Sequence, residues 1–249
     1  FEGDKGKNTG GMGAYSPSRL ENKKLNKKII DKIRKAREKG CTTILMQGGL
    51  NSNIPFSFYT DIVSRTVKEF PDITPHFFSA PEIMKMTEVS GLSIKEVFQE
   101  LKKAGQRTMP GGGSEILTNE IKSKISRFKP KNSVDQWTEV HRNAHEVGIF
   151  TTATMMYGHL EDDEDIIETL MHIRNVQDDA IKSKPAKFTA FIPWSFKKDN
   201  TALGKKIIKE AGPNQYLRII AISRIFLDNV NHIQASWFSE GYKTGQIAL

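Results

Sequence analysis

The chain has 249 residues, of which 37% are hydrophobic, and a formal net charge of +8 at pH 7. This length allows one domain of barrel size or two small ones, and it is sufficient to bury a sizeable core. The mean hydropathy is −0.47, and no apolar run is long enough to cross a bilayer, which excludes an integral membrane protein.

The positive charge is concentrated in Lys23–Lys39, where almost every polar position is Lys or Arg. We interpret this stretch as the solvated face of a helix, because no aromatic residues alternate with the charges as a base-stacking surface requires. No helix-turn-helix, zinc-finger or RNA-binding motif follows it. We therefore expect no nucleic-acid and no membrane partner, and the sequence leaves the oligomeric state open.

The chain has one cysteine, Cys41, which excludes an internal disulfide and a cysteine-cluster metal site. A lone cysteine is typical of a reducing compartment, so we expect a cytoplasmic protein. Cys41 opens an apolar run and is predicted to be a buried structural thiol. His141 and His145 lie one helical turn apart, but the glutamate of an HExxH zinc motif is missing, so we expect no metal site.

Residues 1–18 are rich in Gly, Ser and Asn and predict a loop. We recognise no signal peptide, and the chain begins at Phe1, so we expect a fragment or a processed piece. Apolar residues at helical spacing then alternate with short β-branched or aromatic runs. The predicted helices are Glu21–Lys39, Phe56–Phe70, Glu82–Val89, Ser93–Ala104, Asn119–Phe128, Val134–Val147, Glu164–Ile181, Tyr216–Asn229 and Tyr242–Leu249. The predicted strands are Thr42–Met46, Thr74–Ala80, Gln106–Met109, Phe150–Tyr157, Lys187–Ile192 and His232–Trp237.

The alternation of strands and helices predicts an α/β fold, an incomplete (β/α) TIM-type barrel with about six parallel strands and outer helices. Ligands of such barrels bind at the carboxyl ends of the strands. A doubly wound open sheet is the alternative, although no GxGxxG motif follows the first strand.

The stretch Arg107–Glu115, RTMPGGGSE, places three consecutive glycines at one of these strand ends. Glycine lacks Cβ, so this backbone can adopt positive φ or approach a ligand closely. A tight strand-to-helix turn is the simpler interpretation. Its place at the carboxyl end of a predicted barrel strand favours a ligand-binding loop.

Six runs at the strand ends carry a family resemblance: TTILMQGG (42–49), HFFSAPEI (76–83), PGGGSEIL (110–117), TTATMMYGH (151–159), FTAFIPWSF (188–196) and IQASW (233–237). Residues 34–249 resemble the radical S-adenosylmethionine enzymes of the cyclic dehypoxanthine futalosine synthase family. That family acts in menaquinone biosynthesis by the futalosine pathway. Aminofutalosine synthases and deazaflavin-cofactor synthases share parts of the pattern and stay as alternatives.

The resemblance implies a nucleoside-like substrate, dehypoxanthine futalosine, and two cofactors, S-adenosylmethionine and a 4Fe–4S cluster. The family holds the cluster with a CxxxCxxC loop, which we expect before residue 34 and which this sequence lacks. We therefore expect the chain alone to be inactive in radical chemistry and shorter than the family at both ends. A non-catalytic barrel fragment is a further alternative.

Residues 2–17, EGDKGKNTGGMGAYSP, resemble phosphoribosylamine–glycine ligase, an ATP-grasp enzyme of purine biosynthesis. This likeness predicts a division into a ligase-like loop and helix segment at 1–33, which is not an independent domain, and a partial radical SAM barrel at 34–249. A fragment of such a ligase is the last alternative for the function.

The radical SAM resemblance also implies site residues. Glu82 and Glu115 are candidates for polar substrate contacts or proton handling, and His159 is a third catalytic candidate. A first-turn position in a helix equally explains Glu82, and a capping or buried, hydrogen-bonded ring is the favoured explanation of His159 over catalysis. The implied cofactor-binding residues are Gln47, Gly48, Gly49, Gly111, Gly112, Gly113 and Thr154.

Overall fold

The computed structural model describes residues 22–126, 129–207 and 210–249, and five parallel strands form its sheet in the order β1-β2-β3-β4-β5. The strands are β1 (Thr43–Met46), β2 (Thr74–Phe77), β3 (Thr108–Met109), β4 (Phe150–Tyr157) and β5 (Phe188–Ser195). Strands that are neighbours in sequence are neighbours in the sheet, with no reversal of order. A doubly wound sheet reverses its order at a switch point, so the strand order favours the predicted barrel-type α/β fold.

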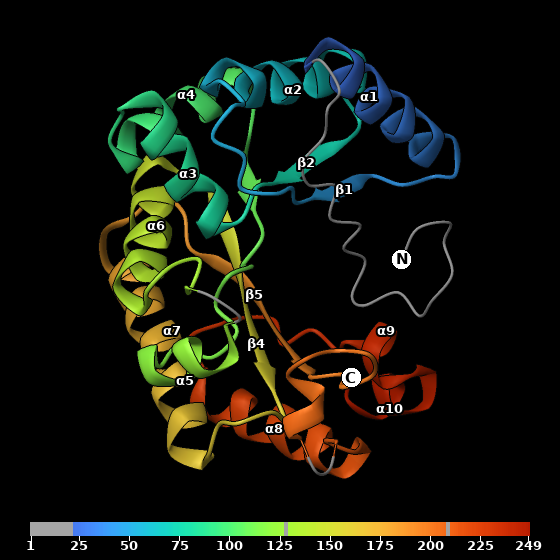
Figure 1. Cartoon of the computed structure of the whole chain (residues 1–249), viewed down its shortest axis with the longest axis vertical. Helices are drawn as coiled ribbons and strands as arrows, with labels where there is room; N and C mark the ends of the chain where they lie inside the picture. The colour runs from blue at the N-terminus through green and yellow to red at the C-terminus, as the bar shows by residue number, and fades with distance from the viewer. Residues whose placement is uncertain (1–21, 127–128, 208–209) are drawn as a thin grey trace.

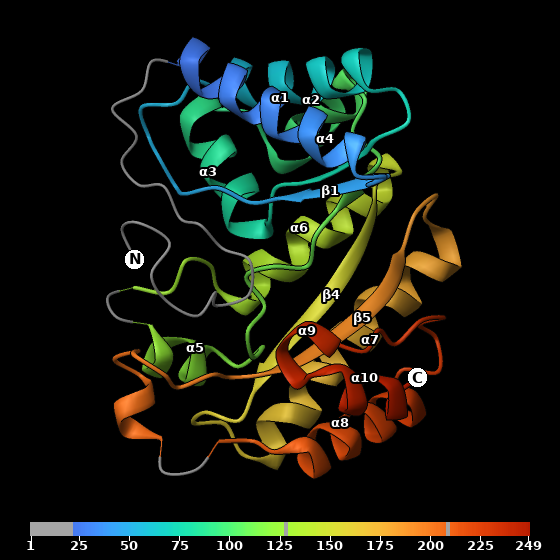
Figure 2. The same cartoon turned by 90° about the vertical axis from the view of Figure 1, so that its right-hand side faces the viewer.

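Helices follow the strands and cover the outer side of the curved sheet (Figures 1 and 2). Because the connections return each strand in the same direction, the carboxyl ends of all five strands meet at one edge. In chain order the helices are α1 (Asn22–Glu38), α2 (Phe56–Glu69), α3 (Ala80–Ser90), α4 (Ile94–Ala104), α5 (Asn119–Ile125), α6 (Val134–Val147), α7 (Asp163–Ser183), the 3₁₀ turn η1 (Gly204–Lys206), α8 (Pro213–Phe226), α9 (Trp237–Glu240) and α10 (Tyr242–Ile247).

Local sequence signals explain where several helices begin and end. The predicted capping box of α4 is present, because Ser93 accepts the Glu96 N–H and Glu96 accepts the Ser93 N–H at 2.8 Å. Gly105 then ends α4 in the left-handed region, at φ 114°.

No helix in the described part of the chain is long and apolar enough to span a membrane.

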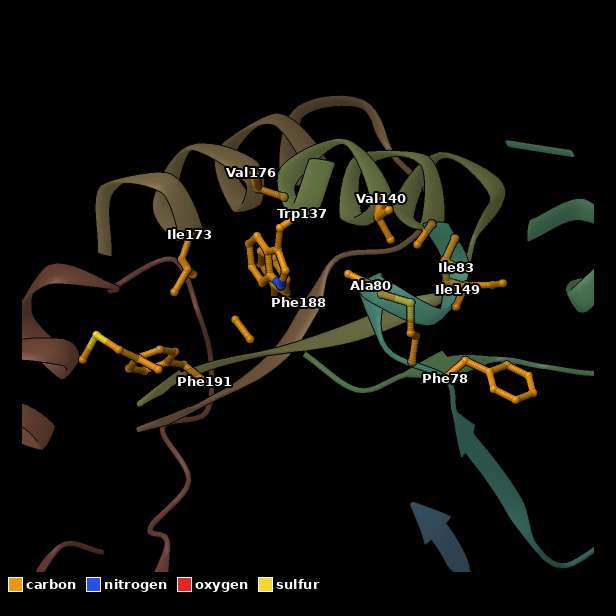
Figure 3. Close-up of a cluster of buried hydrophobic side chains, with 14 of the residues drawn as sticks. Phe78, Ala80, Ile83, Trp137, Val140, Ile149, Ile173, Val176, Phe188 and Phe191 are labelled. Atoms are coloured by element: carbon orange, nitrogen blue, oxygen red, sulfur yellow. The ribbon is translucent and has the colours of Figure 1, made fainter. Parts of the chain in front are cut away.

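One hydrophobic core contains buried residues of helices α1 to α8 and of strands β2 to β5, and Figure 3 shows the part around α6, α7, β4 and β5. Trp137 of α6 is fully buried and stacks on Phe188 of β5, with ring centroids 5.9 Å apart. Such aromatic contacts bury large apolar areas and fix the angle between helix and sheet. This contact packs α6 against the amino end of β5, where Phe188 is the first residue of the strand.

Two predictions made from the sequence are wrong. The predicted sixth strand, His232–Trp237, is reduced to a parallel bridge between Ile233 and Phe191, because α9 begins at Trp237. Cys41 is exposed rather than buried. Its place before β1 explains this, since β1 is an edge strand whose Leu45 is 63% exposed.

Residues 2–17, which carry the ligase resemblance, lie outside the described residues. The predicted division at residue 33 falls inside α1, a helix that continues to Glu38. Ile30 and Ile33, both on the amino-terminal side of this division, belong to the same core as Phe77 of β2 and Phe191 of β5. The division itself stays a prediction.

The two histidines of α6 converge on one hydroxyl of β4. His141 Nδ1 lies 3.0 Å and His145 Nε2 lies 2.8 Å from Thr151 Oγ1, and both rings are fully buried. Burial lowers the pKa of His145 to about 3 and the pKa of His141 well below its ordinary value, the latter with a further contribution from the charge of His145. Among the described residues, no group of three or more His, Cys, Asp or Glu side chains could hold a metal ion.

These buried histidines predict acid sensitivity. Their folded-state pKa values lie below the unfolded value of about 6.5, so the unfolded state binds more protons at lower pH. Stability is fully present above about pH 6.5 and falls toward about pH 3. We expect the free energy of unfolding to drop by about 2 kcal/mol per histidine between pH 7 and pH 5, measured by denaturant titration. Burial also lowers the pKa of His76, to about 4, so H145L should remove about a third of the total slope; parallel curves for H145L and the wild type would contradict the prediction.

Candidate functional site

The carboxyl edge of the sheet brings together loops that are far apart in the sequence. Residues 47–49 follow β1, residues 78–82 follow β2, and residues 110–115 follow β3. Gln47 lies against the β3 loop, since a Cβ placed on Gly112 would be 2.5 Å from Gln47 Nε2 and 3.2 Å from Ser79 Cβ. The first three strands thus contribute to one continuous surface.

Glu82 links the ends of β1 and β2. Its Oε2 accepts hydrogen bonds from the Ser79 N–H at 2.8 Å and the Ser79 hydroxyl at 2.6 Å, while Oε1 accepts the Gly48 N–H at 2.8 Å. Only 3% of the residue is exposed. Burial raises the pKa of Glu82, against the hydrogen bonds from Ser79 and Gly48 that lower it.

These contacts bear on both interpretations of Glu82, as a residue of the first helical turn and as a residue of the ligand site. The carboxylate completes the capping box that starts α3 at Ala80, two residues earlier than the sequence predicts. It also fixes Gly48, which the resemblance assigns to cofactor binding. Burial, together with the charge of Glu82, raises the pKa of the neighbouring Tyr59 to about 12. The catalytic role of Glu82 stays a prediction.

The residue before this capping box has a strained backbone. Phe78 adopts φ 64° although it is not glycine, and its ring is buried edge-to-face against Tyr59, with centroids 5.4 Å apart. Left-handed conformations of bulky residues cost on the order of 1–3 kcal/mol and persist where packing imposes them. Here the packed ring holds the turn that aims Ser79 at Glu82.

The glycine loop after β3 is pressed against β4. A Cβ on Gly111 would lie 2.4 Å from Thr152 O, and one on Gly113, at φ 91°, would lie 2.5 Å from Pro81 Cδ. Both clashes involve rigid groups, so only glycine fits at these positions. The missing side chain of Gly111 lets the loop backbone lie against β4, and that of Gly113 lets it lie against α3.

Hydroxyl groups attach this loop to β4. Thr152 Oγ1 accepts the Gly111 N–H at 3.0 Å, and the Thr154 hydroxyl donates to Gly111 O at 3.0 Å. Ser114 Oγ donates to Thr154 O at 2.6 Å. Thr154, predicted to bind cofactor, therefore lies at the loop and positions it.

Glu115 ends the loop in a left-handed conformation, at φ 44°. Its carbonyl oxygen accepts the Met156 N–H at 2.8 Å, and 36% of its side chain is exposed. Lys122 of α5 lies behind it, with Nζ 3.7 Å from Glu115 Oε2 and only 4% of its side chain exposed. Burial lowers the pKa of Lys122, and the nearby Glu115 carboxylate partly offsets this.

His159 lies in a separate corner after β4. Its Nε2 donates to Met156 O at 3.0 Å, and its Nδ1 lies 2.7 Å from the Leu160 nitrogen and 3.0 Å from Glu161 Oε2. The ring is fully buried. Although burial raises the pKa of Glu161, hydrogen bonds and the charge of His159 hold it below its ordinary value. Protein groups thus engage both ring nitrogens, and the catalytic role of His159 stays a prediction.

Sequence reasoning placed the glycine loop, Gln47 and Glu115 on one surface, as the structure has them. It missed the polar groups that support this surface, Ser79, Ser114 and Lys122, and it missed Glu161 beside His159. The Ser-x-x-Glu spacing of Ser79 and Glu82 is a capping-box signal that could have found the first. Lys122 gave no such signal, because it lies in a run of alternating lysines.

Family models match most of the chain. The radical SAM superfamily matches residues 13–173, and the CofH/MqnC C-terminal region matches residues 185–249. The first match begins inside the ligase-like stretch, and the comparisons give the ligase resemblance no support.

Curated relatives agree with the family models. A cyclic dehypoxanthine futalosine synthase of Halalkalibacterium halodurans is 40% identical over 221 residues, which are 89% of this chain and 57% of the relative. A 5-amino-6-(D-ribitylamino)uracil–L-tyrosine 4-hydroxyphenyl transferase of Methanosarcina barkeri is 39% identical, covering 89% of this chain and 58% of the relative. An aminodeoxyfutalosine synthase of Thermus thermophilus is 33% identical with the same two shares. The chain thus spans less than two thirds of the length of these relatives.

Solved structures share the fold. HydG, a maturase of the [FeFe]-hydrogenase, superposes with a TM-score of 0.67 at 15% identity, over 93% of this chain and 47% of that protein. Methylornithine synthase (PylB) gives a TM-score of 0.67 at 14% identity, over 93% and 60%. At these identities the likeness concerns the fold alone. The barrel-type sheet and a family match over almost two thirds of the chain agree with the resemblance predicted from the strand-end motifs: the chain belongs to the radical SAM superfamily.

Proposed function

We propose that the carboxyl edge of the sheet binds the nucleoside part of S-adenosylmethionine and a nucleoside-like substrate. We further propose that the chain serves the conversion of dehypoxanthine futalosine to its cyclic form in menaquinone biosynthesis, in the cytoplasm. The observation that carries the proposal is the loop 111–115 at the carboxyl edge, where the Glu115 side chain is 36% exposed.

The chemistry of this loop suits a nucleoside. A Cβ on Gly112 would lie 2.5 Å from Gln47 Nε2, so the missing side chain makes room for the Gln47 carboxamide, a group that can hydrogen-bond a base. In the described part of the chain, no group hydrogen-bonds Glu115 Oε1, and the 3.7 Å between Lys122 Nζ and Oε2 exceeds a hydrogen bond. A half-exposed carboxylate of this kind can accept hydrogen bonds from ribose hydroxyls.

The similarity to the cyclic dehypoxanthine futalosine synthase supports this substrate over the two alternatives. The transferase and the aminodeoxyfutalosine synthase match the same share of the chain at 39% and 33% identity. The motifs TTATMMYGH and FTAFIPW favour the cyclase among the three. The first lies on β4, which the loop 111–115 contacts, and the second lies on β5, the next strand in the sheet.

The residues present do not fit a 4Fe–4S cluster. Such clusters are held by several cysteine thiolates, whereas this sequence has only Cys41. That thiol is exposed and lies two residues before β1, at the amino ends of the strands and away from the carboxyl edge. We therefore assign to this chain the binding of nucleosides and no step that uses the cluster.

The nucleoside proposal predicts a role for Glu115 in affinity. We expect E115Q to weaken adenosine binding about 10-fold, because a hydrogen bond to a charged group contributes about 1.5–3 kcal/mol. Isothermal titration calorimetry measures the effect. E120Q, on the exposed side of α5, is the matched control and should bind as the wild type does; equal affinities of E115Q and the wild type would remove Glu115 from the site.

The cysteine count predicts the outcome of cluster reconstitution. Anaerobic incubation of the 249-residue chain with iron and sulfide should yield no 4Fe–4S absorption or electron paramagnetic resonance signal, because three thiolate ligands are missing. Cyclase turnover should likewise be undetectable. A 4Fe–4S spectrum accompanied by turnover would contradict the prediction, and C41A serves as the control for adventitious iron.

A further inference from the structure

Lys122 differs from the other lysine that the structure places on α5. Only 4% of the Lys122 side chain is exposed, whereas 51% of Lys124 is exposed, where it forms an ion pair with Glu120. Removing an ammonium from water costs several kcal/mol unless good acceptors surround it. The burial of Lys122 therefore requires a compensating interaction.

Two carbonyl oxygens of the glycine loop provide it. Lys122 Nζ donates to Gly113 O at 2.6 Å and to Ser114 O at 2.9 Å, and Glu115 Oε2 lies 3.7 Å away. The first two are strong, charge-assisted hydrogen bonds. The ammonium is thus held by three consecutive residues of one loop.

These contacts fix the conformation that presents Glu115. Gly113 and Glu115 both have positive φ, at 91° and 44°. The next carbonyl oxygen, that of Glu115, is held by the Met156 N–H of β4 at 2.8 Å. Donors from α5 and β4 therefore hold three successive carbonyls, and the strained backbone at Glu115 has no freedom to relax.

We propose that Lys122 is a positioning residue for ligand recognition: its buried ammonium holds loop 113–115 and draws Glu115 Oε2 toward α5, which leaves Oε1 to accept the hydroxyls of a nucleoside ribose. This inference rests on the proposed role of the loop in nucleoside binding. An apolar side chain at 122 would fill the same space, but it would satisfy neither carbonyl and would not orient the carboxylate.

The test compares adenosine with 2′,3′-dideoxyadenosine, measured by calorimetry on the full chain. The wild type should prefer adenosine about 10-fold, from the hydroxyl contacts. K122M should reduce this preference to about that of E115Q, whereas K124M on the same helix should retain it. A K122M variant that weakens both nucleosides equally and keeps their ratio would reduce Lys122 to a structural residue and overturn the proposal.

Two further measurements distinguish a failure of this proposal from misfolding of the variant and from a failure of the proposed nucleoside binding. If K122M does not unfold cooperatively, K122R keeps the charge and the donors and should retain the preference; its loss in a folded K122R would overturn the proposal. If the wild type binds neither nucleoside, the proposed function fails. Amide hydrogen exchange then decides the role of Lys122: faster exchange at 113–116 in K122M than in K124M supports it, and unchanged exchange refutes it.

Discussion

The approach of Gly111 to β4 is the contact on which the geometry of the carboxyl edge depends. A Cβ at this position would lie 2.4 Å from Thr152 O and 2.8 Å from Ala153 Cα. Without a side chain, the loop after β3 can follow β4 as a further stretch of extended backbone would. It follows β4 as far as the hydrogen bond between Met156 N–H and Glu115 O. The position of Glu115 is thus set by a steric requirement four residues earlier.

Much of the fold could be predicted because its signals are local. Helical spacing predicted α6 and α7 to within a few residues, and the Ser93–Glu96 capping box predicted the start of α4. The sixth predicted strand failed because HIQASW has strand-like composition, but only Ile233 pairs with β5. The Tyr216 hydroxyl instead bonds the Ser236 N–H at 2.6 Å, just before α9. That competitor lies twenty residues away in sequence, where no local pattern reports it.

In the candidate site, too, some features could be predicted from local sequence signals and others could not. The glycine loop and Glu115 could be placed at the carboxyl edge from the sequence, because they directly follow a predicted barrel strand. The exposure of Cys41 and the burial of Lys122 could not, since each depends on which distant groups surround the residue. Cys41 belongs to an apolar run but precedes an edge strand, and Lys122 belongs to a basic run but reaches the carbonyls of the loop. Local composition predicts a buried Cys41 and an exposed Lys122, which is the opposite of what the structure has.

Glu82 and Lys122 are buried groups of opposite charge, yet neither neutralises the other. Glu82 is compensated by the Ser79 hydroxyl and by backbone N–H groups after β1 and β2, and Lys122 by the carbonyls after β3. Each ion thereby converts a loop that could move into one fixed by charge-assisted hydrogen bonds. The protein itself supplies all of these bonds. The proposed nucleoside recognition would therefore rest on these loops and not on cluster ligands, since the sequence contains one cysteine.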